Sequence, residues 1–155
     1  MTTTEMALPG ADHPDDPLAL DQQVCFALVV AARSVLALYR PVLDRLGLTH
    51  PQYLVMLALW QREPLTVREL GELLSLEPAT LSPLLKRLES TGYLTRTRDP
   101  RDERSLNLAL TAEGRQLRER ALAIPPAIVN RLGMEVAQLK AVHAQLIEVI
   151  ARTEP

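Results

Sequence analysis

The chain has 155 residues, of which 47% are hydrophobic and 23% are charged, and its formal charge at pH 7 is −2. This length suits one domain with its own core, and the balanced charge excludes a strongly basic, histone-like binder and a highly charged disordered chain. A single cysteine, Cys25, excludes an intramolecular disulfide framework and a cysteine-rich zinc fold, and it suits a reducing cytoplasm.

Residues 1–17 differ in charge from the rest of the chain. They hold four acidic side chains and no lysine or arginine, so this segment carries −4 and the remainder carries +2. The segment also holds three prolines and a glycine, and it lacks the basic start and apolar run of a secretory signal. We therefore expect a disordered acidic tail over 1–17 and a single domain over 18–155.

A long apolar helix is predicted over about 18–46. Its longest uninterrupted apolar run, Val24 to Ala32, has nine residues, whereas a membrane span needs roughly 20. We therefore predict a soluble cytoplasmic protein without a membrane partner. Apolar side chains point in many directions around this helix, which predicts burial on all sides. A second copy of the chain is the simplest cover, and the alternative is a central helix in a monomeric bundle.

Two threonines mark the starts of the next helices. Thr49 with Gln52, and Thr66 with Glu69, have the spacing of a capping box. They predict helices over His50 to about Gln61 and from Thr66 to about Leu74. A third helix is predicted from Pro78, which suits a first helical turn, to Gly92.

The apolar period then changes from 3.6 to 2. This predicts strands over 93–97 and 105–110, with a charged hairpin loop over 98–104 between them. A long helix capped by Thr111 should follow to about Arg131, bent or interrupted at Pro125 and Pro126, and a last helix should cover 134–152. The fold class is therefore mainly α with a two-stranded wing: a winged helix-turn-helix over about 49–111, flanked by dimerisation helices over about 18–46 and 112–152.

In such a module the second helix enters the DNA major groove and the wing reaches the backbone or the minor groove. Segment 84–105 carries six basic and four acidic residues. Acids beside the wing arginines can fix guanidinium groups. The predicted DNA-binding residues are Thr80, Ser82, Lys86, Arg87, Arg96, Arg98, Asp99, Arg101 and Arg104. We expect no catalytic site, metal or cofactor, because His13 lies in the tail and His143 stands alone on the last helix.

Several sequence stretches resemble a known family. T-V-R-E-L-G-E-L-L from Thr66, L-K-R-L-E-S-T-G-Y-L from Leu85 and D-P-R-D-E-R-S from Asp99 resemble the multiple-antibiotic-resistance-regulator (MarR) family of dimeric winged-helix repressors. L-D-Q-Q-V-C-F-A-L from Leu20, Y-R-P-V-L-D from Tyr39 and L-T-H-P-Q-Y-L-V-M-L from Leu48 resemble its organic hydroperoxide resistance regulators. The resemblance covers roughly residues 18–152. It implies a homodimeric repressor on a pseudopalindromic double-stranded DNA operator.

For Cys25, the resemblance implies a one-cysteine redox sensor. An isolated cysteine is by default a small buried apolar residue, but this one lies near a helix start, where the dipole stabilises a thiolate. An organic hydroperoxide would oxidise it to a sulfenic acid, and a low-molecular-weight thiol would reverse the change through a mixed disulfide.

The resemblance also implies that tyrosines of the partner subunit hydrogen-bond the sulfur. Tyr39 matches one of them, and the 14 residues from Cys25 to Tyr39 span about 21 Å of helix, which is too far for contact along one straight helix. Val29 and His50 stand where tyrosines are often found, so the hydrogen-bond network must differ. His50 could donate to a thiolate, and Tyr53 is expected to pack nearby.

Two other functions remain open from the sequence. One is a DNA-binding repressor released by a small aromatic or phenolic ligand, held by groups such as Arg33, Arg40 and His50. The other is a thiol peroxidase built on Cys25, although no Pro/Thr/Arg constellation surrounds the cysteine in sequence.

Overall fold

The computed structural model describes residues 16–100 and 102–153, which form two compact units that divide between Leu38 and Tyr39. The predicted acidic tail lies almost entirely outside the described residues, and so does Arg101. The predicted long helix is confirmed: it consists of a 3₁₀ turn at Leu20–Gln22, helix α1 at Val24–Leu43 and a second 3₁₀ turn at Asp44–Leu46.

The first unit contains most of α1, and many of its apolar side chains are exposed. Val24 is 71% exposed and Val29 is 47% exposed. By length and composition alone, the stretch Val24–Leu46 is long and apolar enough to cross a membrane. Arg33 and Ser34 interrupt the apolar run, but the mean hydropathy of the stretch stays high. The main helix of a soluble protein meets the same criteria.

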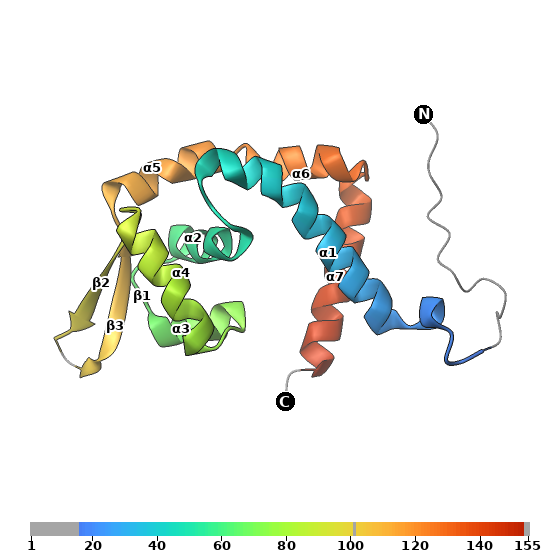
Figure 1. The fold of residues 1–155 in the computed structure, drawn as a ribbon, viewed down its shortest axis with the longest axis horizontal. Coiled ribbons are helices and arrows are strands. Elements are labelled where there is room, and N and C mark those ends of the chain that lie inside the picture. Colours follow the sequence, from blue (N-terminus) through green and yellow to red (C-terminus); the bar gives the residue numbers. More distant parts are fainter. Residues whose placement is uncertain (1–15, 101, 154–155) are drawn as a thin grey trace. The chain divides into compact units, whose positions relative to one another are not determined.

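The second unit holds the remaining elements, and they confirm a mainly helical winged fold (Figure 1). In chain order they are α2 His50–Gln61, β1 Leu65–Thr66, α3 Val67–Leu74, α4 Pro78–Ser90, β2 Leu94–Asp99, β3 Asp102–Leu110, α5 Ala112–Ala121, α6 Ile124–Leu132 and α7 Val136–Thr153. We call α2 through β3, residues 50–110, the winged helix.

Both predicted capping boxes are present. The Thr49 hydroxyl accepts the backbone N–H of Gln52, whose side chain accepts the N–H of Thr49. Thr66 and Glu69 make the same reciprocal pair, at 3.1 Å and 2.8 Å. Each box satisfies backbone donors that a helix start leaves without partners, so these helices begin where local sequence dictates.

The sheet differs from the expectation in two respects. It has three antiparallel strands in the order β1, β3, β2, with Leu65 opposite Leu108 and Leu94 opposite Leu110. Strand β1 was not predicted, because its two residues are too few to show a period. The predicted loop over 98–104 is wrong, because the strands continue to Asp99 and restart at Asp102. Charged side chains resemble a loop in composition, although a solvated hairpin arm accommodates them.

Leucines from α2, α3, α4 and the sheet form the core of the winged helix. Leu81, Leu85 and Leu88 of α4 are buried as predicted, and Leu84 is half-buried. They pack with other buried residues of the unit, which include Val55, Met56, Leu59, Leu65, Leu70, Leu94 and Leu108. The opposite side of α4 is therefore free to meet a partner.

The predicted helix from Thr111 to Arg131 is interrupted, as the paired prolines indicated. Helix α5 ends at Ala121 and α6 starts at Ile124, so that Pro125 falls in a first turn, where its missing N–H costs nothing. Helix α7 is confirmed, and its apolar residues are largely exposed, with Ile147 at 51% and Ile150 at 50%.

Candidate DNA interface and thiol site

Helix α4 exposes the polar residues that the sequence analysis selected. Thr80 and Ser82 in its first half, and Lys86 and Arg87 in its second half, are all exposed. They are separated from the buried leucines by the helical period, so one side of α4 is core and the other is a polar surface with two cations. This is the arrangement that a helix in a DNA groove requires.

Arg96 is held by an acid and is not free. Its Nε and Nη2 atoms both donate to Glu89 Oε2, at 2.8 Å and 2.6 Å, and both side chains are about one-third exposed. The hydrogen bonds from Arg96 and its charge lower the pKa of the Glu89 carboxyl, against a smaller effect of burial. The pair links strand β2 to the end of α4, so it fixes the wing relative to that helix.

The arm of the wing carries the remaining predicted DNA-binding residues. Arg98 and Arg104 are exposed, and the backbone N–H of Arg104 donates to Asp102 Oδ1 at 3.0 Å. The Asn107 amide donates to Asp99 at 3.4 Å. Two exposed guanidinium groups thus stand on the arm, while the aspartates bind backbone and side-chain donors of the same hairpin.

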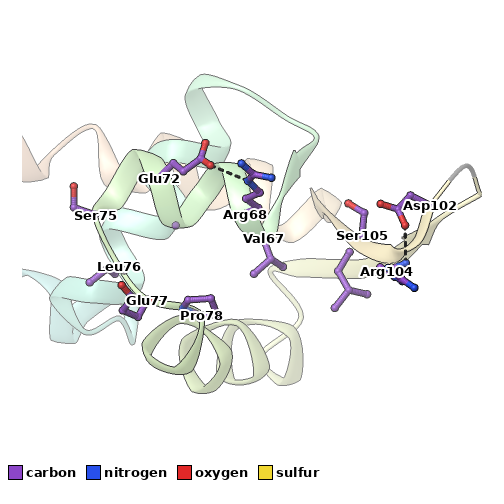
Figure 2. Close-up of a pocket in the computed structure, with 12 residues that line it drawn as sticks. Val67, Arg68, Glu72, Ser75, Leu76, Glu77, Pro78, Asp102, Arg104 and Ser105 are labelled. Atoms are coloured by element: carbon purple, nitrogen blue, oxygen red, sulfur yellow. Dashed lines mark hydrogen bonds and ion pairs between the residues drawn. The ribbon is translucent and has the colours of Figure 1, made fainter. Parts of the chain in front are cut away.

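A groove of about 790 Å³ separates α3 and the turn before α4 from strand β3 (Figure 2). Val67, Leu76, Pro78 and Leu106 supply apolar lining. Arg68 pairs with Glu72 at 2.9 Å along α3. Because three carboxylates, on Glu72, Glu77 and Asp102, outnumber the guanidinium groups of Arg68 and Arg104 in the lining, the groove does not favour a phosphate chain.

Cys25 is the second residue of α1, and its thiol is free and exposed. No acidic residue occupies the first turn of α1. The default interpretation, a buried apolar cysteine, does not describe this residue. The site is chemically accessible to a small oxidant within its own unit.

The structure brings together the other three predicted sensing residues, Tyr39, His50 and Tyr53, in the second unit. The ring centroid of His50 lies 5.0 Å from that of Tyr39 and 6.4 Å from that of Tyr53. Burial raises the pKa of both tyrosines and lowers the pKa of His50. At neutral pH the cluster therefore presents neutral hydroxyl and imidazole N–H donors.

Trp60 was missed as a site residue. Its ring centroid lies 6.4 Å from that of Tyr53 in an edge arrangement, and both side chains line a cavity of about 470 Å³ together with Arg118 of α5 and apolar residues such as Leu57 and Pro125. The helical spacing of Tyr53, Leu57 and Trp60 on α2 could have indicated a shared face. Arg118 lines this cavity only because of tertiary packing, which the spacing of residues along α2 cannot predict.

Comparisons with known proteins identify the winged helix. Residues 48–106 match the model of the MarR family. The chain is also 42% identical over 138 residues to the organic hydroperoxide resistance transcriptional regulator of Bacillus subtilis, an alignment that covers 87% of this chain and 94% of the relative. The chain belongs to the MarR family. MarR proteins are transcription regulators and not enzymes, so the thiol peroxidase alternative is set aside, and α1 is a helix of a soluble fold.

Two solved MarR-type structures extend the comparison. Reduced AbfR bound to DNA has a TM-score of 0.71 and 34% identity, covering 86% of this chain and 93% of its own; AbfR is a protein of Staphylococcus epidermidis. CouR from Rhodococcus jostii bound to p-coumaroyl-CoA has a TM-score of 0.76 and 26% identity, covering 89% of this chain and 99% of its own. One relative is thus seen with DNA and the other with an aromatic ligand.

Proposed function

We propose that this regulator is a cytoplasmic, homodimeric repressor that binds a pseudopalindromic operator and releases it when an organic hydroperoxide oxidises Cys25. The observation that carries the proposal is the free, exposed thiol in the first turn of α1, in a chain related to an organic hydroperoxide resistance regulator. The one-cysteine composition leaves no resolving thiol within the subunit.

The chemistry at Cys25 is a displacement on the peroxide. The thiolate attacks the terminal oxygen of ROOH, the S–O bond forms as the O–O bond breaks, and the alcohol ROH leaves with a proton. A low-molecular-weight thiol then condenses with the sulfenic acid to give a mixed disulfide and water. A second thiol regenerates Cys25 and carries away the small disulfide.

Operator binding would use α4 and the wing. The exposed groups Thr80, Ser82, Lys86 and Arg87 would face the major groove, and Arg98 and Arg104, with Arg101 beyond the described residues, would reach the minor groove or the phosphates. Arg96 and Asp99 take positioning roles instead, because the Arg96 guanidinium is bound by Glu89 and the Asp99 carboxylate by Asn107.

The exposed apolar residues of α1 and α7 support the dimer. Val24, Leu28 and Val29 in the first unit, and residues such as Val142, Ile147 and Ile150 in the second, expose apolar surface that a second copy could cover. The resemblance to organic hydroperoxide resistance regulators implies that, in such a dimer, Cys25 of the partner subunit lies near Tyr39, with His50 beside it. The neutral donors of that cluster would then hydrogen-bond the sulfur.

The deciding experiment compares wild type with Cys25→Ser. A DNA duplex selected from a randomised library by the reduced wild type serves as the probe. Treatment with cumene hydroperoxide is expected to weaken wild-type binding by about tenfold or more, and addition of free cysteine should restore it. Cys25→Ser should bind equally well before and after oxidant. Normal release by Cys25→Ser would eliminate thiol sensing.

A second candidate function, release by an aromatic acid, is favoured by the cavity beside Trp60. Its lining offers two aromatic rings and Arg118, whose guanidinium suits a carboxylate, in place of the predicted Arg33, Arg40 and His50. The similarity to CouR, whose structure holds p-coumaroyl-CoA, supports this second function. Titration with 4-hydroxycinnamate is the test. This function requires saturable binding that is weakened by Arg118→Gln but not by Arg131→Gln, at an exposed position of α6.

A further inference from the structure

Three hydrogen bonds join the end of α2 and the segment just after it to the end of β3 and the first turn of α5. Trp60 Nε1 donates to the carbonyl oxygen of Gly114 at 2.8 Å. Glu63 accepts the backbone N–H of Leu110 at Oε2, at 2.8 Å, and the Nε–H of Arg115 at Oε1, at 2.9 Å. We call these five residues the α2–α5 junction. One carboxylate thereby connects the segment after α2, the last residue of β3 and the first turn of α5.

Further hydrogen bonds and close packing hold the α2–α5 junction in place. The Thr111 hydroxyl donates to the carbonyl oxygen of Gly92 at 2.6 Å and accepts the N–H of Gly114 at 3.0 Å. Gly114 itself is pressed against the start of β2, where an added Cβ would collide with the carbonyl oxygen of Tyr93. A rotation of α5 relative to the winged helix must therefore break several of these bonds together.

Helix α5 is the connection from the winged helix to α6 and α7. Arg120, further along α5, donates to the carbonyl oxygen of Arg45 at 2.9 Å, just before α2. The helix is thus bonded at its first turn to the end of α2 and at its last turn to the segment before α2. Any coupling of α6 or α7 to the winged helix along α5 would act through these two bonded points.

Glu63 is suited to hold this position because its charge is engaged on both oxygens. Its side chain is 26% exposed, and that of Arg115 is 57% exposed. Burial raises the pKa of Glu63, but the Leu110 N–H and the Arg115 guanidinium together lower it below its ordinary value. The carboxylate is therefore ionised at neutral pH. A glutamine could keep one acceptor for Leu110 but would lose the ion pair.

We infer that Glu63 is a positioning residue that couples the C-terminal helices to the winged helix through the α2–α5 junction. The role in peroxide response rests on the proposed function above. The coupling itself requires only DNA binding: fixing the winged helix on a duplex should stabilise α5, and loosening the junction should abolish that effect while leaving the α4 surface intact.

Hydrogen exchange on the full chain tests the coupling without any oxidant. With the selected duplex bound, amide exchange over residues 112–121 is expected to slow by about fivefold or more in wild type. Glu63→Gln and Arg115→Gln should lose this slowing, and Arg115→Lys should recover part of it. Glu119→Gln, an equal charge change at an exposed site of the same helix, is the matched control. Wild-type slowing in both junction variants, or no slowing in wild type, would overturn the inference.

A second measurement uses Trp60, the single tryptophan of the chain. Because its indole donates to Gly114, its emission reports opening of the junction directly. Cumene hydroperoxide should shift this emission and release DNA in wild type, whereas Glu63→Gln should retain DNA within about threefold of its reduced affinity. If wild type fails to respond to oxidant, the redox proposal fails while the exchange result still decides the coupling. Equal release by Glu63→Gln would contradict Glu63's role in transmission.

Discussion

Arg104 and Arg96 illustrate how two arginines eight residues apart on one hairpin acquire different roles. Arg104 is exposed, and its guanidinium is available to DNA. Arg96 is engaged by Glu89 at 2.6 Å. Both residues carry the same formal charge, so the sequence could not predict which guanidinium is paired. That pairing depends on which strand position faces the end of α4.

Replacing Arg104 with alanine should therefore weaken DNA binding directly. If the guanidinium contacts phosphate, the slope of log affinity against log salt should fall by about 1. Fluorescence anisotropy with the selected duplex over a salt series measures both quantities, and Arg131→Ala on α6 is the control. An unchanged slope together with unchanged affinity would remove Arg104 from the interface.

Glu89 should make stability depend on pH. The hydrogen bonds from Arg96 lower its pKa in the folded state below the unfolded value of about 4.3. The stabilisation is thus fully present above that unfolded value and is lost as the pH falls through the lower folded value. Urea midpoints of wild type and Glu89→Gln should differ at pH 7 and converge towards pH 3. A constant difference across this range would mean that the Glu89 charge is not what stabilises the pair.

At the scale of elements, local chemistry explains what could be predicted. The capping boxes at Thr49 and Thr66 fix two helix starts to the residue, because a side-chain hydroxyl and a backbone N–H three residues on satisfy each other without help from the rest of the fold. Strand β1 and the ends of the hairpin could not be predicted in this way, since their pairing partners lie more than forty residues away or among solvated charges.

The candidate site divides along the same line. Tyr39 was selected by resemblance, His50 as a possible donor to the thiolate and Tyr53 as a residue that packs nearby, and the three do meet in the fold. Trp60 and Arg118 belong to different helices 58 positions apart and meet by tertiary packing alone, so no spacing rule on one helix identifies them as a pair.

Thr66→Ala should test how much a capping box contributes to α3. The hydroxyl accepts the Glu69 N–H and also donates to its carboxylate at 2.9 Å, so its loss should lower the free energy of unfolding by about 1 kcal/mol. Chemical denaturation measures the change, and Thr97→Ala, an exposed strand position, controls for loss of a threonine. A difference close to zero between the two variants would show that tertiary packing alone defines this helix start.

At the scale of the whole molecule, the overall charge of −2 conceals the local cations on α4 and the wing. The regulator should therefore depend on two correctly spaced winged helices rather than on general attraction to DNA, and dimerisation becomes a requirement for operator binding. The exposed apolar side chains of α7 are the surface on which that requirement can be tested.

Ile147→Glu should dissociate the proposed dimer, because it places a charge in an apolar interface at a residue that is 51% exposed in the single chain. Sedimentation equilibrium should show a monomer, and operator binding should weaken with it. Gln145→Glu, on the same helix and already polar, should leave the dimer intact. A dimeric Ile147→Glu protein would relocate the interface away from α7.

The absence of space around Gly114 has a consequence for dividing this protein into fragments. The family match ends at residue 106 and the predicted winged helix at about 111, yet Trp60 and Glu63 find their partners at Gly114 and Arg115. A fragment that stops at either boundary would leave the indole N–H of Trp60 without its acceptor and the half-buried carboxylate of Glu63 without its ion pair. The smallest autonomous DNA-binding piece of this chain should therefore extend through α5, and expression trials that cut at the recognised boundary should yield insoluble material.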